Sequence, residues 1–282
     1  MEVSSIAEQL YFTSVRVETI DASDNKGIAT SFIFDYKSEN KQYPFLITNK
    51  HVVSGTERGR LTFIQARNGK PLLGTGFTLD IEHFENIWYG HPRTNIDVAV
   101  APFAPLVDQI KKAGTNIFFR WIGNEVVPSE DDLKHVDAIE EVVFIGYPIG
   151  IWDTKNLLPV VRKGITASPI AVDFRGEPQF LVDASIFPGS SGSPVFLYNP
   201  GIYADKSGGT VVGTRLYFLG VVASVFFQED VNEIRIRSIP TLDLPVSVSR
   251  QMVDLGVVFK ASTILETIEA FLKERGELTA SP

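Results

Sequence analysis

The feature that most constrains the fold of this chain is a two-residue alternation of apolar and polar side chains in short runs. Val15 and Val17 alternate with Arg16 and Glu18, and residues 28–36 continue the pattern. Successive side chains of a strand point to opposite faces, so this period is typical of half-buried strands. Glycine, asparagine, proline or charged clusters separate the runs, as the turns of antiparallel sheets require. The pattern predicts an all-β fold.

Twelve strands are predicted, in two groups of six. The first group covers residues 15–18, 28–36, 45–47, 61–64, 76–81 and 97–103, and the second covers 142–147, 160–167, 179–187, 194–198, 210–227 and 233–238. A hairpin tip is expected at 204–209. The chain therefore divides into a β-rich half at 1–104, a connector at 105–141, a second β-rich half at 142–261 and a C-terminal helix and tail at 262–282.

Three helical segments are expected outside the strands. Within the connector, residues 106–113 favour a short helix, and Ser129 precedes an acidic first turn that it can cap. Near the end of the chain, the apolar residues of 262–274 share one helical face, and Thr263 with Glu266 forms a candidate capping box. Gly276 is a candidate stop. We expect this last helix to dock on the second β-rich half rather than to bind a partner.

Composition excludes several classes of protein. The chain has 282 residues, of which 44% are hydrophobic and 21% charged, as in a folded globular protein. The net charge of −8 would be repelled by phosphate backbones, so nucleic acid is not an expected partner. The absence of cysteine excludes disulfides, thiolate zinc sites and a cysteine nucleophile. We see neither a secretory signal nor an apolar run of membrane-spanning length, and therefore expect a cytoplasmic protein without a membrane partner.

Residues 187–196 are the least ordinary segment of the sequence. Their Gly/Ser/Pro composition is compatible with a simple turn. The same composition also suits a serine nucleophile, which must project its Oγ from a tight, rigid turn beside small neighbours. Gly189 and Ser191 could then offer backbone N–H groups to a developing oxyanion. On this hypothesis Ser191 is the nucleophile.

A serine nucleophile needs a base and an orienting carboxylate. All four histidines (His51, His83, His91 and His135) precede Ser191, which excludes the chain order of α/β-hydrolases. His51 ends an apolar run and would be held rigidly, although a partly buried histidine bonded to a carbonyl would look the same. Asp97 opens a run without other charges until Asp108, although it could simply end a strand or cap a turn.

These segments together resemble a known family. Residues 47–53 (ITNKHVV), 97–100 (DVAV) and 189–194 (GSSGSP) resemble the His, Asp and Ser motifs of chymotrypsin-fold, trypsin-like serine peptidases. The bacterial branch that includes the high-temperature-requirement proteases is the most similar. Residues 143–150, 163–167 and 219–224 resemble strands of the second barrel of that family. The likeness spans roughly residues 10–262.

The resemblance implies two antiparallel six-stranded β-barrels with a C-terminal helix, and a serine endopeptidase that uses no cofactor. By carry-over, Ser191 is the nucleophile, His51 the general base and Asp97 the orienting carboxylate. The N–H groups of Gly189 and Ser191 would form the oxyanion hole. A peptide or protein would be the substrate, and regulation would come from a partner protein or from the catalytic loops.

The sequence departs from the family pattern at two positions. Ser193 replaces the usual second glycine, which could crowd the loop. Ser190 replaces the aspartate that pairs with a freed N-terminus in digestive members, so we expect activity without N-terminal cleavage. Family geometry places the substrate pocket at Ser185, Phe187, Ala223, Ser224 and Val225. Because Ser185 is not a carboxylate, cleavage after lysine or arginine is not expected.

Other arrangements are weaker. His83 and His91 cluster with Glu82 and Glu85 but lack the spacing of a zinc site, and no metal is expected. Two further functions remain open on the sequence. One is a catalytically silent relative that binds peptides in the cleft between its barrels. The other is an esterase or acyltransferase that uses the same triad, because the acyl-enzyme chemistry is shared.

Overall fold

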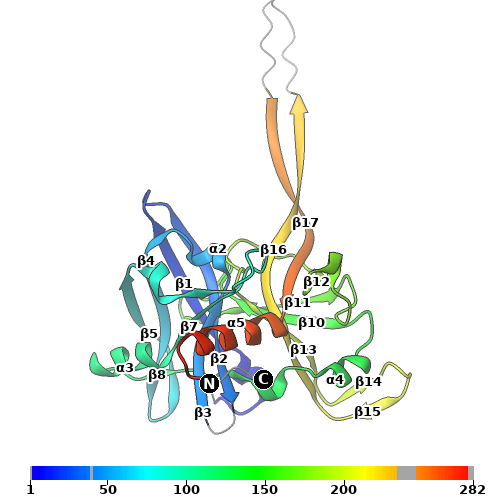
Figure 1. The fold of residues 1–282 in the computed structure, drawn as a ribbon, viewed down its shortest axis with the longest axis horizontal. Coiled ribbons are helices and arrows are strands. Elements are labelled where there is room, and N and C mark those ends of the chain that lie inside the picture. The colour runs from blue at the N-terminus through cyan, green and yellow to red at the C-terminus, as the bar shows by residue number, and fades with distance from the viewer. Residues whose placement is uncertain (1, 39–40, 234–245, 279–282) are drawn as a thin grey trace, which may run out of the picture.

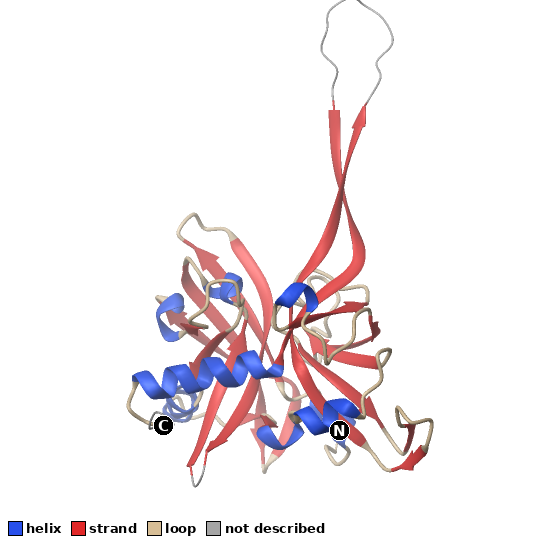
Figure 2. Cartoon of the chain, turned by 45° about the vertical axis from the view of Figure 1, so that its right-hand side comes forward, coloured by secondary structure: helices blue, strands red, loops and turns tan. Residues whose placement is uncertain are grey.

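The computed structural model describes residues 2–38, 41–233 and 246–278, with the backbone alone for 225–233 and 246–253. Its strands form one large sheet from each half of the chain (Figures 1 and 2). The strands of the N-terminal sheet are β1 (Ser14–Asp21), β2 (Lys26–Ser38), β3 (Lys41–Thr48), β4 (Thr56–Arg67), β5 (Lys70–Glu82), β6 (Tyr89–Gly90), β7 (Ala99–Pro102), β8 (Ile117–Phe118) and β9 (Ile122–Gly123).

The N-terminal sheet has nine strands, three more than the alternation predicts. Its main path runs β5-β4-β1-β2-β3-β7-β6, while β8 pairs with β4 and β9 pairs with β2. All six predicted strands are present. The three additional strands, β6, β8 and β9, have two residues each, which is too short to produce a periodic pattern. Two of them, β8 and β9, come from the predicted connector.

The C-terminal half forms the expected closed barrel of six strands. In spatial order they are β10 (Glu141–Gly146), β11 (Val160–Thr166), β12 (Gln179–Asp183), β17 (Val246–Lys260), β16 (Arg215–Glu233) and β13 (Pro194–Asn199). The ends of β16 and β17 extend beyond the barrel as a two-stranded ribbon (Figure 1). The all-β class, the closed six-stranded barrel of the second half and the C-terminal helix are thus confirmed. The first half was predicted as an antiparallel six-stranded barrel, whereas it forms a nine-stranded sheet in which β2 and β9 pair in parallel.

Three predicted strands of this half need comment. The predicted strand 210–227 is two strands, because β15 (Thr210–Val212) pairs with β14 (Ile202–Ala204) in the expected hairpin before β16 begins. The predicted strand 179–187 ends at Asp183, where the chain turns toward the loop that carries Ser191. The predicted strand 233–238 lies, apart from its first residue, outside the described residues.

The α-helices are α1 (Ile6–Leu10), α2 (Lys50–Val53), α3 (Ala104–Lys112), α4 (Glu130–Lys134) and α5 (Ala261–Glu274), and the described residues also include the short 3₁₀ helices η1 (Phe84–Ile87), η2 (Asn124–Val126) and η3 (Phe174–Gly176). The predicted cap of α4 is confirmed, because Ser129 and Asp132 form a capping box. The predicted capping box of α5 is wrong. Strand β17 runs directly into this helix, so its N-cap is Lys260, and the hydroxyl of Thr263 donates to the Lys260 carbonyl at 2.8 Å. Gly276 follows the helix with a φ of 69°, as expected of a stop.

Helix α5 packs on both halves of the molecule rather than on the second half alone. It contacts β6 and β7 of the N-terminal sheet and β16 and β17 of the barrel. Its buried face shares one hydrophobic cluster with both sheets, including Phe34, Val98, Phe218, Ile264 and Ile268. Figure 2 shows the helix lying across the front of the molecule. Within the ranges that the structure describes, no helix is long and apolar enough to cross a membrane.

Candidate active site

The residues around His51 hold its ring against Asp97. Strand β3 ends at Thr48, and the fully buried Asn49 begins the single turn of α2. The Asn49 side-chain amide donates to the Asp97 carbonyl at 2.7 Å, and the His51 backbone N–H donates to the Asp97 carboxylate at 3.0 Å. The His51 Nδ1 lies 2.6 Å from Asp97 Oδ2. The structure therefore brings these two predicted site residues together.

The bond between His51 and Asp97 determines which nitrogen of the neutral His51 ring carries the proton. An ionised carboxylate can only accept hydrogen bonds, so Nδ1 of His51 carries the ring proton. The lone pair of Nε2 is then free to accept a proton from another group. The His51 side chain is 50% exposed and that of Asp97 27%. The ring is therefore accessible, while its partner is largely sheltered.

Asp97 is held by its position just before β7. Its neighbours Ile96 and Val98 are both fully buried, and the backbone N–H of His91 donates to the Val98 carbonyl at 2.8 Å. Burial on both sides of Asp97 limits the movement of its backbone. The predicted strand began at this residue, whereas β7 begins two residues later, and Asp97 thus lies in the loop that leads into the strand.

The loop around Ser191 is fixed by the other half of the molecule. The Thr30 hydroxyl donates to the Gly189 carbonyl at 3.0 Å and accepts from the Tyr147 N–H at 2.9 Å. The Thr30 N–H donates to the Ser191 carbonyl at 2.9 Å. A Cβ at Gly192, whose φ is 83°, would lie 1.8 Å from the Thr30 carbonyl oxygen, so this position requires glycine.

Backbone N–H groups in this loop alternate between bonded and free. Those of Ser190 and Gly192 donate to the carbonyls of Phe187 and Val222, at 3.0 and 2.9 Å. Those of Gly189 and Ser191 have no acceptor among the described residues. Two free donors, one of them on the candidate nucleophile, are what an oxyanion site needs.

The hydroxyl of Ser191 makes a long hydrogen bond. It donates to the carbonyl of Ala223 on β16 at 3.4 Å, and within the described part of the chain it has no hydrogen bond to His51. Bonds of this length are weak. In structures without substrate, catalytic hydrogen bonds are often long or poorly aligned.

The two departures from the family pattern are accommodated in the interior. Ser193 is fully buried, and a Cβ at Gly146 would lie 2.0 Å from its Oγ, so the missing side chain of Gly146 makes room for Ser193. Ser190 is also buried, at 1% exposure. The hydroxyls of both serines have no partner among the residues described. The space beside Gly146 is therefore what accommodates the Ser193 side chain.

The residues of the predicted substrate pocket have different environments. Ser185 is half-buried, Ala223 is buried, Ser224 is exposed, and Val225 lies on β16. Phe187 is 41% exposed, and the guanidinium of Arg162 stacks on its ring at 4.6 Å. The sequence did not point to Arg162, because this residue lies 25 positions before Phe187 and just outside the segment 163–167 that resembles a family strand.

The histidine and glutamate cluster at 82–91 does not form a metal site. His83 adopts a left-handed backbone conformation with a φ of 52°, whereas His91 is buried beside α5. Across the described ranges, no group of three or more histidine, aspartate or glutamate side chains could hold a metal ion.

Comparison with known proteins gives similarity at the level of the fold. No protein-family model and no curated protein sequence matches the chain. Among solved structures, it is similar to the HtrA-type protease AlgW (16% identity over 98% of this chain and 65% of AlgW, TM-score 0.48). It is also similar to the serine endoprotease from Yersinia pestis (16%, 97% and 69%, 0.49) and to the Rv3671c protease from M. tuberculosis (16%, 98% and 86%, 0.43). The chain thus spans about two thirds of AlgW, and what it shares with these proteases is the fold.

Proposed function

We propose that this chain is a serine endopeptidase in which Ser191 is the nucleophile, His51 the general base and Asp97 the orienting carboxylate. The observation that carries the proposal is the pairing of His51 with Asp97, at 2.6 Å through Nδ1 and at 3.0 Å through the backbone N–H. Two bonds from one carboxylate to one residue orient the ring and leave Nε2 as the base.

The reaction would follow the acyl-enzyme route. Nε2 of His51 takes the proton of Ser191 Oγ as the oxygen attacks the scissile carbonyl carbon. The carbonyl oxygen becomes an oxyanion, which accepts from the free N–H groups of Gly189 and Ser191. The protonated His51 then gives its proton to the leaving amine, and a water activated by the same ring hydrolyses the ester.

The first step requires a movement of the Ser191 side chain. Its hydroxyl must turn from the Ala223 carbonyl toward His51, which exchanges a long bond of 3.4 Å for a bond to the base. The present bond to Ala223 is also the one observation that favours the alternative of a silent peptide-binding relative. The two functions differ in whether that hydroxyl becomes reactive.

The surroundings of Phe187 support a limit on the substrate. Arg162 places a cation on the exposed ring of Phe187, which is one of the predicted pocket residues. A cationic substrate side chain would be repelled there. This agrees with the expectation from Ser185 that cleavage after lysine or arginine is disfavoured.

Labelling with a fluorophosphonate probe tests the proposal. The wild-type chain should become labelled and Ser191→Ala should not. Ser207→Ala, in the exposed hairpin between β14 and β15, should serve as a matched control that labels like the wild type. Absence of labelling in a folded wild-type protein would contradict the proposal and support the silent peptide binder. Turnover of peptides rather than of simple esters alone then separates an endopeptidase from an esterase.

A further inference from the structure

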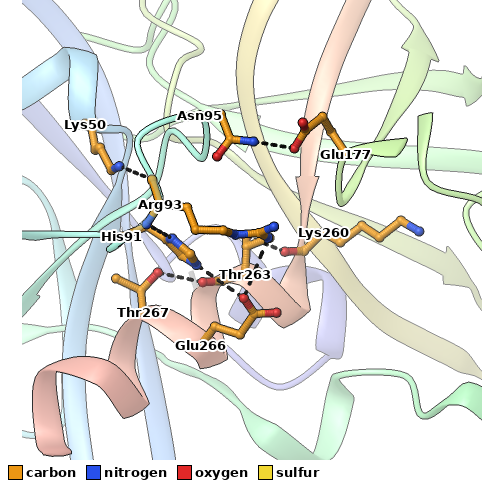
Figure 3. Close-up of polar contacts among 9 residues, drawn as sticks. All are labelled: Lys50, His91, Arg93, Asn95, Glu177, Lys260, Thr263, Glu266 and Thr267. Atoms are coloured by element: carbon orange, nitrogen blue, oxygen red, sulfur yellow. Dashed lines mark hydrogen bonds and ion pairs between the residues drawn. The ribbon is translucent and has the colours of Figure 1, made fainter. Parts of the chain in front are cut away.

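The loop at residues 91–97, which we call the Asp97 loop, is fastened to three neighbouring elements (Figure 3). Lys50 of α2 donates through Nζ to the Arg93 carbonyl at 2.7 Å. Asn95 donates to Glu177 of the C-terminal half at 2.6 Å. The third connection runs from His91 to Glu266 on α5. Each connection joins this loop to a segment far away in the sequence.

His91 stands at the base of the Asp97 loop and is almost fully buried, at 6% exposure. Its backbone N–H donates to the carbonyl of Val98, the residue that follows Asp97. Its ring Nδ1 accepts the backbone N–H of Arg93 at 3.0 Å, so this nitrogen carries no proton. The proton of the neutral ring is then on Nε2, which faces the Glu266 carboxylate at 3.3 Å.

Glu266 can serve this loop because it does not cap its own helix. The sequence predicts a capping box between Glu266 and Thr263. In the structure the Glu266 carboxylate faces His91 instead, and it also lies 3.9 Å from the Arg93 guanidinium. Helix α5 itself is anchored in the core by Ile264 and Ile268, both fully buried. The acceptor for His91 is therefore mounted on a rigid element.

We propose that Glu266 and His91 are positioning residues, which hold the Asp97 loop against α5 and thereby keep the Asp97 carboxylate on the imidazole of His51. The proposal rests on the proposed serine peptidase function. Removal of the Glu266 acceptor would leave the buried Nε2–H of His91 without its protein partner. The ring would shift, and the loop whose base it forms would shift with it.

A small displacement of Asp97 would have a large effect on reactivity. Its carboxylate holds His51 through bonds of 2.6 and 3.0 Å, both of which depend on the position of the loop. A misplacement of about 1 Å at a catalytic group can lower a rate by about 10²-fold. We expect a partial loss, because Lys50 and Asn95 still fasten the loop.

Three variants of α5 test the proposal. Glu266→Ala removes the acceptor, and Glu266→Gln keeps an oxygen that can accept from His91. Glu269→Ala is the matched control, since Glu269 lies one turn further on the same helix and bonds to Tyr36 rather than to the Asp97 loop. The measurement is the second-order rate constant for labelling by a small fluorophosphonate, with the melting temperature recorded alongside.

We expect labelling of Glu266→Ala to slow by between about tenfold and about 10²-fold, the upper value being the effect of misplacing a catalytic group by about 1 Å. Glu266→Gln should recover most of the rate, and Glu269→Ala should label like the wild type. A merely structural Glu266 would lower the melting temperature of Glu266→Ala and leave its labelling rate at 25 °C unchanged. That outcome would overturn the proposal.

A nuclear magnetic resonance measurement separates this proposal from the proposed function. The Nδ1 proton of His51, held between the ring and Asp97, should give a resonance that Glu266→Ala broadens or shifts and Glu269→Ala preserves. If the wild type does not label at all but this resonance responds to Glu266→Ala, the peptidase proposal fails and the positioning role stands. An unchanged resonance in Glu266→Ala refutes the positioning role.

Discussion

At the scale of single residues, Ser193 and Gly146 depend on each other. Ser193 is fully buried beside Gly146, where a Cβ would lie 2.0 Å from its Oγ and 2.7 Å from the Thr30 Oγ1. The space beside Gly146 is filled by the hydroxymethyl group of Ser193. A side chain at residue 146 would therefore clash with both Ser193 and Thr30, and more closely with Ser193.

We therefore predict that Gly146→Ala lowers the free energy of unfolding by about 1–3 kcal/mol, as overpacked interiors do. Adding Ser193→Gly should restore part of that loss, because it removes the closer of the two clashing atoms. Urea denaturation of both single variants and of the double variant measures the coupling. If the change in the free energy of unfolding of the double variant equals the sum of the changes in the two single variants, the two residues do not share this space.

Single residues also show what could be predicted from the sequence at the candidate site. His51, Asp97 and Ser191 each lie within a short motif, so their residue types and neighbours indicated a role. Thr30 lies in an ordinary alternating strand, and its partners Tyr147 and Gly189 are 117 and 159 positions away. Local pattern contains no information about such contacts. Glu266 illustrates the same limit, since its local partner in the sequence is not its partner in the fold.

At the scale of elements, a buried ion pair joins β16 to the start of the barrel. Arg215 makes two bonds of 2.8 and 2.9 Å to Glu140, with side chains that are 5% and 11% exposed. Arg215 also bonds to Asn199 of β13 at 2.9 Å. The next residue along the chain, Glu141, pairs with Lys163 on the surface.

These adjacent glutamates give a matched comparison. Glu140→Gln should lower the free energy of unfolding by about 3–5 kcal/mol, because it leaves the Arg215 charge buried without a counter-charge. Glu141→Gln should change it by less than about 1 kcal/mol, since its partner is exposed and screened. Thermal or urea denaturation measures both. Equal effects of the two substitutions would contradict this account of the buried pair.

The contact between α5 and the Asp97 loop predicts a pH dependence of stability. Burial lowers the pKa of His91 below its ordinary value of 6.5; Glu266 opposes this shift, whereas Arg93 and Lys50 add to it. The unfolded chain therefore binds a proton at this residue at a higher pH than the folded chain. The free energy of unfolding should fall as the pH is lowered below about 6.5, by up to about 1.4 kcal/mol per pH unit from this group.

A variant isolates this contribution from those of other groups. The difference in stability between the wild type and His91→Gln should be constant above neutral pH and should shrink as the pH falls below 6.5. Denaturation curves at several pH values measure it. A difference that grows on acidification would mean that the folded protein prefers the charged imidazole.

Elements differ in how well the sequence predicts them. Long alternating strands and the apolar face of α5 were predicted, because burial on one side imposes a period on the residues. The two-residue strands β6, β8 and β9 were not, since they are defined only by their hydrogen bonds to distant strands. The observed start of α5 differs from the predicted one because β17 continues into the helix without a loop.

At the scale of the whole molecule, the two halves meet at Thr30. Its hydroxyl bonds to Tyr147 and Gly189 of the second half, and nearby the Ser14 hydroxyl donates to the Ile145 carbonyl at 3.0 Å. These bonds are buried. They fix the Ser191 loop, which belongs to the barrel, relative to the sheet that carries His51.

We predict that Thr30→Val both destabilises the protein, by about 1–3 kcal/mol, and slows the labelling of Ser191. Valine keeps the shape of the side chain but leaves the Tyr147 N–H and the Gly189 carbonyl without their partner. Ser31→Ala is the matched control, because the buried Ser31 hydroxyl has no partner among the described residues. If Thr30→Val is labelled at the same rate as Ser31→Ala, the hydrogen bonds of the Thr30 hydroxyl do not set the geometry of the loop that carries Ser191.

The most direct test of the triad is a crystal structure of the chain after reaction with a peptidyl phosphonate. We predict a bond from phosphorus to Ser191 Oγ, with the phosphonyl oxygen accepting from the N–H groups of Gly189 and Ser191. His51 should keep its bond to Asp97 and direct Nε2 at the adduct. An adduct on another residue, or one on Ser191 with the His51 ring turned away, would contradict the account.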